Sequence, residues 1–304
     1  MSLLIISPPR SGSSIVAQLV ENAGLETDKI KENQIFINPS IFNKNGYNED
    51  VCFTLLNDQI IRCIYGNEFS FIHAPHPLKI KELFSIENFD LRDKIPQNYE
   101  YDLSEETIFK PQDYEKNIKK YCGCEWDVWG LTRMEKEKKW YRAYSKFNVS
   151  NKEEILIKFN QFQEKLRLSK NYYLKDPRLI FALPAYWNFI KLQKNIKIIY
   201  IQRNPIDTLK SMRAHYGNRI FTKKYIKNTK IVSNHFNYQI KSQSINEYFQ
   251  SCIITKNFIK SLGDNHLVID YDNLVDKRKS LEEIRKLEKF LNIKINSDLV
   301  KRLN

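Results

Sequence analysis

Residues 3–20, LLIISPPRSGSSIVAQLV, decide the fold. The apolar run 3–6 predicts a buried strand, and the apolar residues of 15–20 predict a helix. Small residues form the turn between them. A tight turn from strand to helix aims several backbone N–H groups and the positive end of the helix dipole at one place. Such a turn is built to hold a phosphate.

The turn differs from a Walker A loop. It lacks the GxxxxGK[ST] spacing, and its basic residue, Arg10, precedes the Ser-Gly pair instead of following a second glycine. A P-loop kinase or other NTPase, the first alternative function, places a lysine in this loop and a magnesium-binding Ser or Thr directly after it. Neither residue is present, so the sequence disfavours this alternative.

A second junction between a strand and a helix lies two-thirds along the chain. Residues 197–202, KIIYIQ, predict another buried strand, which ends at Arg203. Asn204 can cap the following helix, and Pro205 suits its first turn. Ser211 lies eight residues after Arg203, about two turns along that helix.

Together the two junctions resemble the sulfotransferase family, which uses 3′-phosphoadenosine 5′-phosphosulfate (PAPS) as its donor. In that family the first turn holds the 5′-phosphosulfate, and an arginine with a serine eight residues later holds the 3′-phosphate. A late segment, YDNL at 271–274, resembles a family segment whose tyrosine lies near the adenine. The resemblance therefore implies this donor site: Arg10, Ser11, Gly12, Ser13, Ser14, Arg203, Ser211 and Tyr271.

Residues 175–179, KDPRL, resemble an element of many bacterial sulfotransferases. The resemblance implies that Lys175 helps to stabilise the transferring sulfuryl group, while Arg10 faces the bridging oxygen and the 5′-phosphate. Asp176 and Arg178 have a second interpretation, as a pair that holds the turn together. No metal is obligatory for such a reaction, because fixed cationic side chains can neutralise the departing phosphate.

The general base is the assignment that the sequence leaves most open. Residues 46–49, GYNE, resemble the Gly-aromatic-x-Glu segment of bacterial members, which favours Glu49. A glutamate at the start of a helix is also favoured by the helix dipole alone. Asp176, His73 and His76 are the other candidates. We expect Glu49 to be the base, acting beside Arg10 and Lys175.

Strands that alternate with helices predict an α/β fold with a central parallel sheet flanked by helices, as in P-loop NTPase-like sulfotransferases. No composition break divides the chain, so we expect one domain over residues 1–304. Ligands in such sheets bind beyond the carboxyl ends of the strands. The predicted strands are 3–6, 172–175, 197–202 and 266–271, and predicted helices include 50–65, 150–168 and 280–291.

Two long segments, 67–170 and 218–262, carry no family motif. We expect them to contain helical insertions that shape the acceptor pocket, because variable segments around a fixed site commonly set specificity. The expected acceptor is a small molecule or a glycan. The sequence leaves open which acceptor is used, whether oxygen or nitrogen is sulfated, and the oligomeric state.

The chain has 304 residues and a formal net charge of +13. This charge suits attraction of an anionic donor, but it also suits a lysine-rich surface. A basic protein that binds nucleic acid without catalysis is accordingly the second alternative, and its binding would fall steeply with salt. On the family resemblance we expect no nucleic-acid partner.

Five cysteines are scattered along the chain, an odd number without the spacing of a disulfide framework. This pattern fits a reducing cytoplasm. Cys122 and Cys124 have no second Cys/His pair at a ligand spacing, so we expect no metal site. No apolar run approaches the thickness of a bilayer, and we expect no membrane span.

Overall fold

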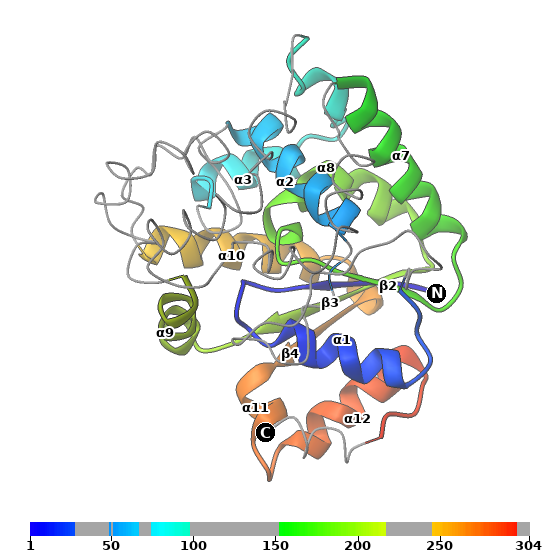
Figure 1. The fold of residues 1–304 in the computed structure, drawn as a ribbon, viewed down its shortest axis with the longest axis vertical. Coiled ribbons are helices and arrows are strands. Elements are labelled where there is room, and N and C mark those ends of the chain that lie inside the picture. The colour runs from blue at the N-terminus through cyan, green and yellow to red at the C-terminus, as the bar shows by residue number, and fades with distance from the viewer. Residues whose placement is uncertain (28–48, 50, 67–73, 98–151, 217–244, 297–304) are drawn as a thin grey trace, which may run out of the picture.

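Among the residues that the structure describes, four parallel strands form a central sheet (Figure 1). The computed structural model describes residues 1–27, 49, 51–66, 74–97, 152–216 and 245–296. The strands lie in the order β2-β1-β3-β4. Their bounds are β1 Ser2–Ile6, β2 Tyr172–Lys175, β3 Ile196–Gln202 and β4 His266–Asp270.

The register brings the carboxyl ends of the strands to one edge of the sheet. Ile6, the last residue of β1, pairs with Tyr200 near the end of β3. Lys175, the last residue of β2, pairs with Ile5. The segments that follow these strands therefore leave the sheet side by side, at the edge where α/β proteins bind their ligands.

Helices cover both faces of the sheet (Figure 1). Leu4 and Ile6 point to one apolar core and Leu3 and Ile5 to the other, because successive side chains of a strand face opposite ways. The first core includes residues of α2 Val51–Tyr65, α3 Pro77–Phe84, α7 Lys152–Leu168, α8 Leu179–Leu192, α9 Pro205–Tyr216 and α10 Ile245–Lys260. The second includes residues of α1 Ser13–Asn22, α11 Tyr271–Val275 and α12 Ser280–Leu291.

The fold class is confirmed: the chain is a single α/β domain with a parallel sheet and flanking helices. Several predicted bounds also agree, since β2 and α12 begin and end where the sequence places them. The last strand was predicted one residue too long, because Tyr271 begins α11. Asp270 caps that helix by accepting a hydrogen bond from the backbone N–H of Asn273 at 3.0 Å.

Helix α8 was not predicted from the sequence. Its sequence, LIFALPAYWNFIKL, is apolar almost throughout and contains Pro184. The helix packs against α2, α3 and α10, so it lacks the polar face on which helical periodicity depends. Helix α3 and the short 3-10 turn Leu91–Asp93 also lie in a segment whose elements were not predicted.

Much of the two expected insertions, 67–170 and 218–262, lies outside the described residues. Their described parts contain α3, α7 and α10 and no strand. Their role in shaping an acceptor pocket stays a prediction, as does the extent of the domain. No helix in the described part of the chain is long and apolar enough to cross a bilayer.

Candidate active site

The turn between β1 and α1 has the shape of an anion-binding loop. Arg10 and Gly12 both have left-handed backbones, with φ of 64° and 85°. Helix α1 begins at Ser13, and its N-cap residue, Gly12, has no side chain to cap the first N–H groups. The hydroxyls of Ser7 and Ser11 are fully buried and have no hydrogen-bond partner among the described residues. Donors that lack a partner within the loop suit a bound anion, so the loop fits a phosphate or phosphosulfate.

Gly12 is required for two physical reasons. Its positive φ disfavours any residue with a Cβ. A Cβ at this position would also overlap the ring of Tyr271, which lies directly against the loop. Tyr271, predicted to lie near the adenine, is therefore placed by the structure at the phosphate loop, at the end of β4.

Arg203 contacts the loop directly. Its Nη1 donates to the backbone carbonyl oxygen of Arg10 at 3.0 Å. Its guanidinium lies 4.6 Å from the centre of the Tyr271 ring, within reach of a cation–π interaction. Its Nε lies 3.6 Å from an Asp272 carboxylate oxygen. The strand ends of β1, β3 and β4 thus meet around one guanidinium.

Ser211 of α9 contacts the side chain of Arg10. Its hydroxyl accepts a hydrogen bond from Arg10 Nε at 3.3 Å. The role of Ser211 beside Arg203 at the 3′-phosphate stays a prediction. The Arg10 side chain therefore reaches toward α9. Asn204 and Pro205 open α9 as expected, since the Asn204 side chain accepts from the Ile206 N–H at 2.9 Å.

A buried cluster of four charges lies beside the loop, at the end of β2. Lys175 Nζ is 2.5 Å from one oxygen of Glu49. Arg178 lies between the carboxylates, 3.4 Å from the other oxygen of Glu49 and 3.0 Å from Asp176. Lys175 Nζ also lies 3.4 Å from the hydroxyl of Ser14 in the first turn of α1. This last contact joins the cluster to the phosphate loop.

The cluster continues into the core through residues that the sequence did not reveal. Asn57 of α2 donates to Asp176 at 2.9 Å, and Tyr186 of α8 donates to Asn57 at the same distance. All are buried. Asn57 is a polar residue on the apolar face of a predicted helix, and this was the only sign of it in the sequence. Nothing in the sequence pairs Asn57 with Asp176, which lies 119 positions away.

Burial raises the pKa of Asp176 to about 6, against the opposing influence of Arg178 and the hydrogen bond from Asn57. Burial also opposes the charge on Arg178, but the attraction of Asp176 and Glu49 outweighs it and raises the pKa of that guanidinium. Asp176 and Arg178 therefore form an ion pair at neutral pH. The second interpretation of KDPR, a pair that holds the turn, describes their geometry.

The histidine candidates for the base lie apart from the cluster or outside the described residues. His76 is exposed and accepts the Leu78 N–H at 3.3 Å, which caps α3. His73 falls outside the described residues, as do Cys122 and Cys124. Within the described ranges, no group of three His, Cys, Asp or Glu residues could hold a metal ion.

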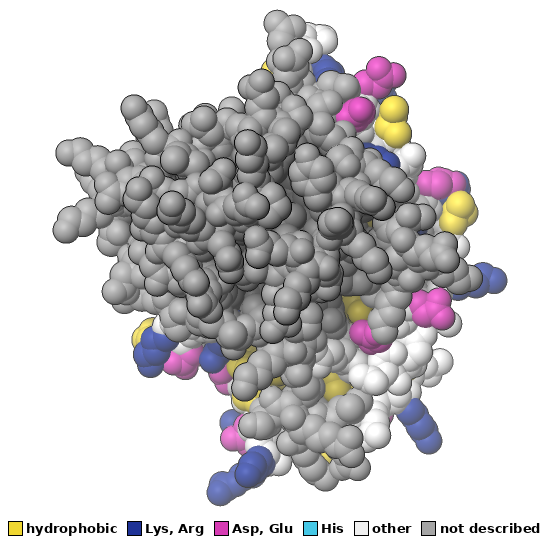
Figure 2. All heavy atoms as spheres, in the orientation of Figure 1, with side chains coloured by type: hydrophobic (Ala, Val, Ile, Leu, Met, Phe, Trp, Pro, Cys, Tyr) yellow, Lys and Arg dark blue, Asp and Glu magenta, His cyan; other side chains and the backbone are white. Residues whose placement is uncertain are grey.

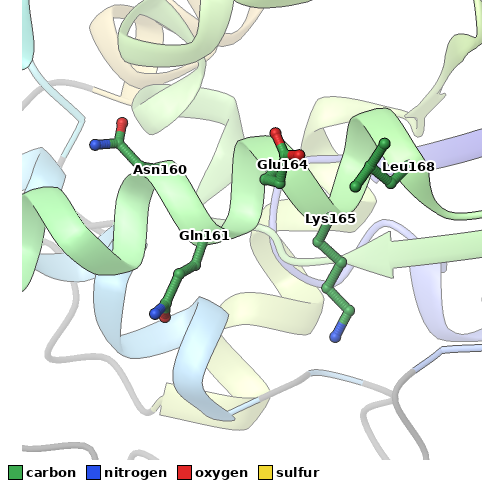
Figure 3. A pocket seen from close by; sticks show the side chains of 5 residues that line it. All are labelled: Asn160, Gln161, Glu164, Lys165 and Leu168. Carbon is green, nitrogen blue, oxygen red and sulfur yellow. The ribbon is translucent and has the colours of Figure 1, made fainter.

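A surface hollow lies elsewhere, along α7 (Figure 3). None of the residues predicted to bind the donor lines it, so it does not belong to this site. Its lining among the described residues comes from one helix: Asn160, Gln161, Glu164, Lys165 and Leu168.

Comparison with known proteins identifies the family to which this chain belongs. The family model described as "Sulfotransferase domain" matches residues 1–304, and the chain belongs to that family. A solved structure, the sulfotransferase domain from the curacin biosynthetic pathway, is similar over 98% of this chain and 75% of its own, with 14% identity and a TM-score of 0.39. A comparison with curated proteins found no match. Family membership supports sulfuryl transfer as the activity and makes the protein a transferase.

Proposed function

We propose that the protein transfers a sulfuryl group from PAPS to a hydroxyl or amine of a small molecule or carbohydrate. One observation carries this proposal: Arg203 Nη1 donates to the carbonyl of Arg10 at 3.0 Å. Two cationic segments, 193 positions apart in the sequence, lie against each other. A single adenosine with phosphates at both ends of its ribose requires such an arrangement.

The donor residues divide between its two phosphate ends. Ser11, Ser13 and Ser14 would hold the 5′-phosphosulfate with the loop N–H groups, where the orphaned Ser11 hydroxyl favours an anion. Arg203 and Ser211 would hold the 3′-phosphate, because a guanidinium fork matches phosphate geometry. When bound, PAPS supplies an electrophilic sulfur with a phosphate leaving group.

Arg10 lies between these two groups. Its backbone forms the loop and its side chain reaches Ser211, so it adds positive charge to both phosphate positions. In the proposed reaction this charge would help to neutralise the departing phosphate.

Glu49 is the proposed base. Its contact with Lys175 links the protonation of Glu49 to the electrostatic field at the phosphate loop. Glu49 takes the proton of the attacking group and becomes neutral. Lys175, whose ammonium lies 2.5 Å from that carboxylate, then loses the negative charge that it faced. Its positive charge is left beside Ser14 in the first turn of α1, where it would stabilise charge on the sulfuryl group of a bound donor. The transfer of one proton thus strengthens the field at the reacting centre.

Asp176 suits the role of base poorly. Its side chain is fully buried, and its two oxygens accept hydrogen bonds from Asn57 and from the backbone and guanidinium of Arg178. A base must reach the proton that it removes. Among the candidates within the described residues, Glu49 has the better position because it contacts Lys175, the residue that touches the loop.

Ligand-dependent unfolding tests the donor. Adenosine 3′,5′-bisphosphate, the product left by PAPS, should raise the unfolding temperature, since a ligand at 100 times its Kd adds about 2.7 kcal/mol. ATP with magnesium should raise it less. Stabilisation by ATP with magnesium alone would overturn the proposal. Incubation of labelled PAPS with glycans, phenols and lipid precursors would then identify the acceptor class.

Neither alternative function gains an observation from the described residues. The loop has no lysine at the Walker position, as the sequence already showed. Figure 2 shows basic and acidic side chains mixed along the rim where α7 lies. Arg167 and Glu164 form an ion pair there, so this rim has charge of both signs rather than a continuous basic surface. A cytoplasmic location stays a prediction.

A further inference from the structure

Arg203 is bonded to the backbone of the phosphate loop. The carbonyl oxygen that accepts from its Nη1 belongs to Arg10, whose φ of 64° is unusual for a residue with a side chain. Such backbones persist where surrounding contacts hold them. A donor 3.0 Å from this oxygen restrains the peptide plane that follows Arg10, and therefore restrains the turn.

The guanidinium that supplies this donor is itself fixed. One face lies against the ring of Tyr271, and its Nε lies 3.6 Å from Asp272 Oδ1. The other oxygen of Asp272 accepts the backbone N–H of Asn204 at 3.0 Å. A carboxylate held by the residue next to Arg203 and a ring at the end of β4 together set the plane of the guanidinium.

The same unit also supports the second left-handed residue. The Tyr271 ring that packs on Arg203 lies where a Cβ of Gly12 would be. Arg203 and Tyr271 thus contact the loop at both positions of positive φ. Nη2 of Arg203 has no hydrogen-bond partner among the described residues, so the planar fork has a donor to offer a ligand while Nη1 holds the loop.

We propose that Arg203 is a positioning residue for the 5′ end of the donor site, in addition to its part at the 3′-phosphate. It keeps the turn of Arg10 and Gly12 in the shape that binds an anion. This inference rests on the proposed function, because both concern one donor site. Its distinctive consequence is that a nucleotide without a 3′-phosphate still depends on Arg203.

Calorimetric titration with two nucleotides tests this consequence. Arg203→Met should weaken binding of adenosine 3′,5′-bisphosphate at least about tenfold and should also weaken 5′-AMP at least about fivefold. Lys210→Met is the matched control, because Lys210 lies on α9, is 73% exposed and pairs with Asp207. It should change either affinity less than about twofold.

A second background separates positioning from simple attraction of charge. Glycine adopts a left-handed backbone without strain. In Arg10→Gly the turn therefore no longer depends on the hydrogen bond from Arg203 to keep that conformation. Adding Arg203→Met to that variant should therefore weaken 5′-AMP less than about twofold further. An equal loss in both backgrounds would mean that Arg203 acts on the 5′-phosphate through its charge, and would overturn the proposal.

The remaining outcomes are also decisive. If Arg203→Met leaves 5′-AMP affinity intact while bisphosphate affinity falls, Arg203 serves only the 3′-phosphate and the positioning role is wrong, although the proposed function survives. If the unaltered protein binds neither nucleotide, the proposed function fails and the inference fails with it. Should Arg203→Met not fold, as judged by circular dichroism, Arg203→Lys replaces it, because a lysine cannot form the planar fork; loss of 5′-AMP affinity is expected there too.

Discussion

The two halves of the candidate site treat charge in opposite ways. At the ends of β3 and β4, Arg203 is 21% exposed and its nearest carboxylate, on the 44% exposed Asp272, lies 3.6 Å away. At the end of β2, two carboxylates and two cations are buried against one another at 2.5 to 3.4 Å. On the proposed function, the first half would attract an anion, whereas the charges of the second half balance until Glu49 takes up a proton.

We propose that the first half binds the donor and that the second takes part in the reaction. On that proposal, the half with partly exposed cations and buried hydroxyls that lack a partner among the described residues would hold a phosphate group whether or not an acceptor is present. The balanced half changes its charge only when Glu49 becomes protonated. The loop joins the halves, since Ser14 contacts Lys175 and the Arg10 carbonyl contacts Arg203.

The largest effect is expected where the balanced half is broken. Arg178→Met leaves Glu49 and Asp176 without the cation between them, and unpairing a buried charge costs about 3–5 kcal/mol. Urea unfolding measures this loss of stability. The control is Lys79→Met, which removes an exposed partner of Glu82 and should have a far smaller effect. Similar losses in both variants would contradict the buried cluster as a source of stability.

The next effect concerns turnover alone. Glu49→Gln removes the proposed base while it preserves the shape of the side chain, so turnover should fall at least about a hundredfold. Affinity for adenosine 3′,5′-bisphosphate should stay within about threefold, because the donor half is untouched. Initial rates with labelled PAPS and calorimetry measure the two quantities. Full activity in this variant would place the base elsewhere.

Alanine substitutions at two glycines with similar φ angles test whether the Tyr271 ring requires a glycine in the phosphate loop. Gly12→Ala should lower the free energy of unfolding by about 1–3 kcal/mol and abolish donor binding, since φ is 85° and the Tyr271 ring occupies the added Cβ position. Gly24→Ala is the control, because Gly24 has a φ of 93° but open space around its Cβ. The difference between the two variants measures the overlap with Tyr271. Equal effects would remove Tyr271 from the explanation.

The last expected effect is a pH dependence of stability. Burial raises the pKa of Asp176 to about 6, above its ordinary value of 3.8. Between these values the folded state binds this proton and the unfolded state does not, so the group makes folding less favourable as pH rises and its penalty is complete above pH 6. Asp176→Asn should remove this slope, about 2 kcal/mol between pH 4 and pH 7. Urea unfolding at both pH values decides it; equal slopes would contradict the raised pKa.

Much of the fold could be predicted because its signals are local. The bounds of β2 and α12, the N-terminal cap of α9 and the turn after β1 depend on neighbouring residues, and the structure agrees with each. The all-apolar α8 was missed because it is buried on several sides, and Tyr271 was placed in β4 because an aromatic residue suits a strand as well as a helix start.

By itself, the sequence determined the α/β class with its parallel strands, and it predicted candidate anion-binding residues at the strand ends. The tertiary structure alone decided which of them touch: Arg203 holds the backbone of Arg10, Ser211 faces Arg10, and Asn57 and Tyr186 extend the charged cluster into the core. The reason is physical. Turns, caps and periodicity arise from forces between near neighbours in the chain, whereas these contacts join residues more than a hundred positions apart and exist only once the sheet has brought its strand ends together.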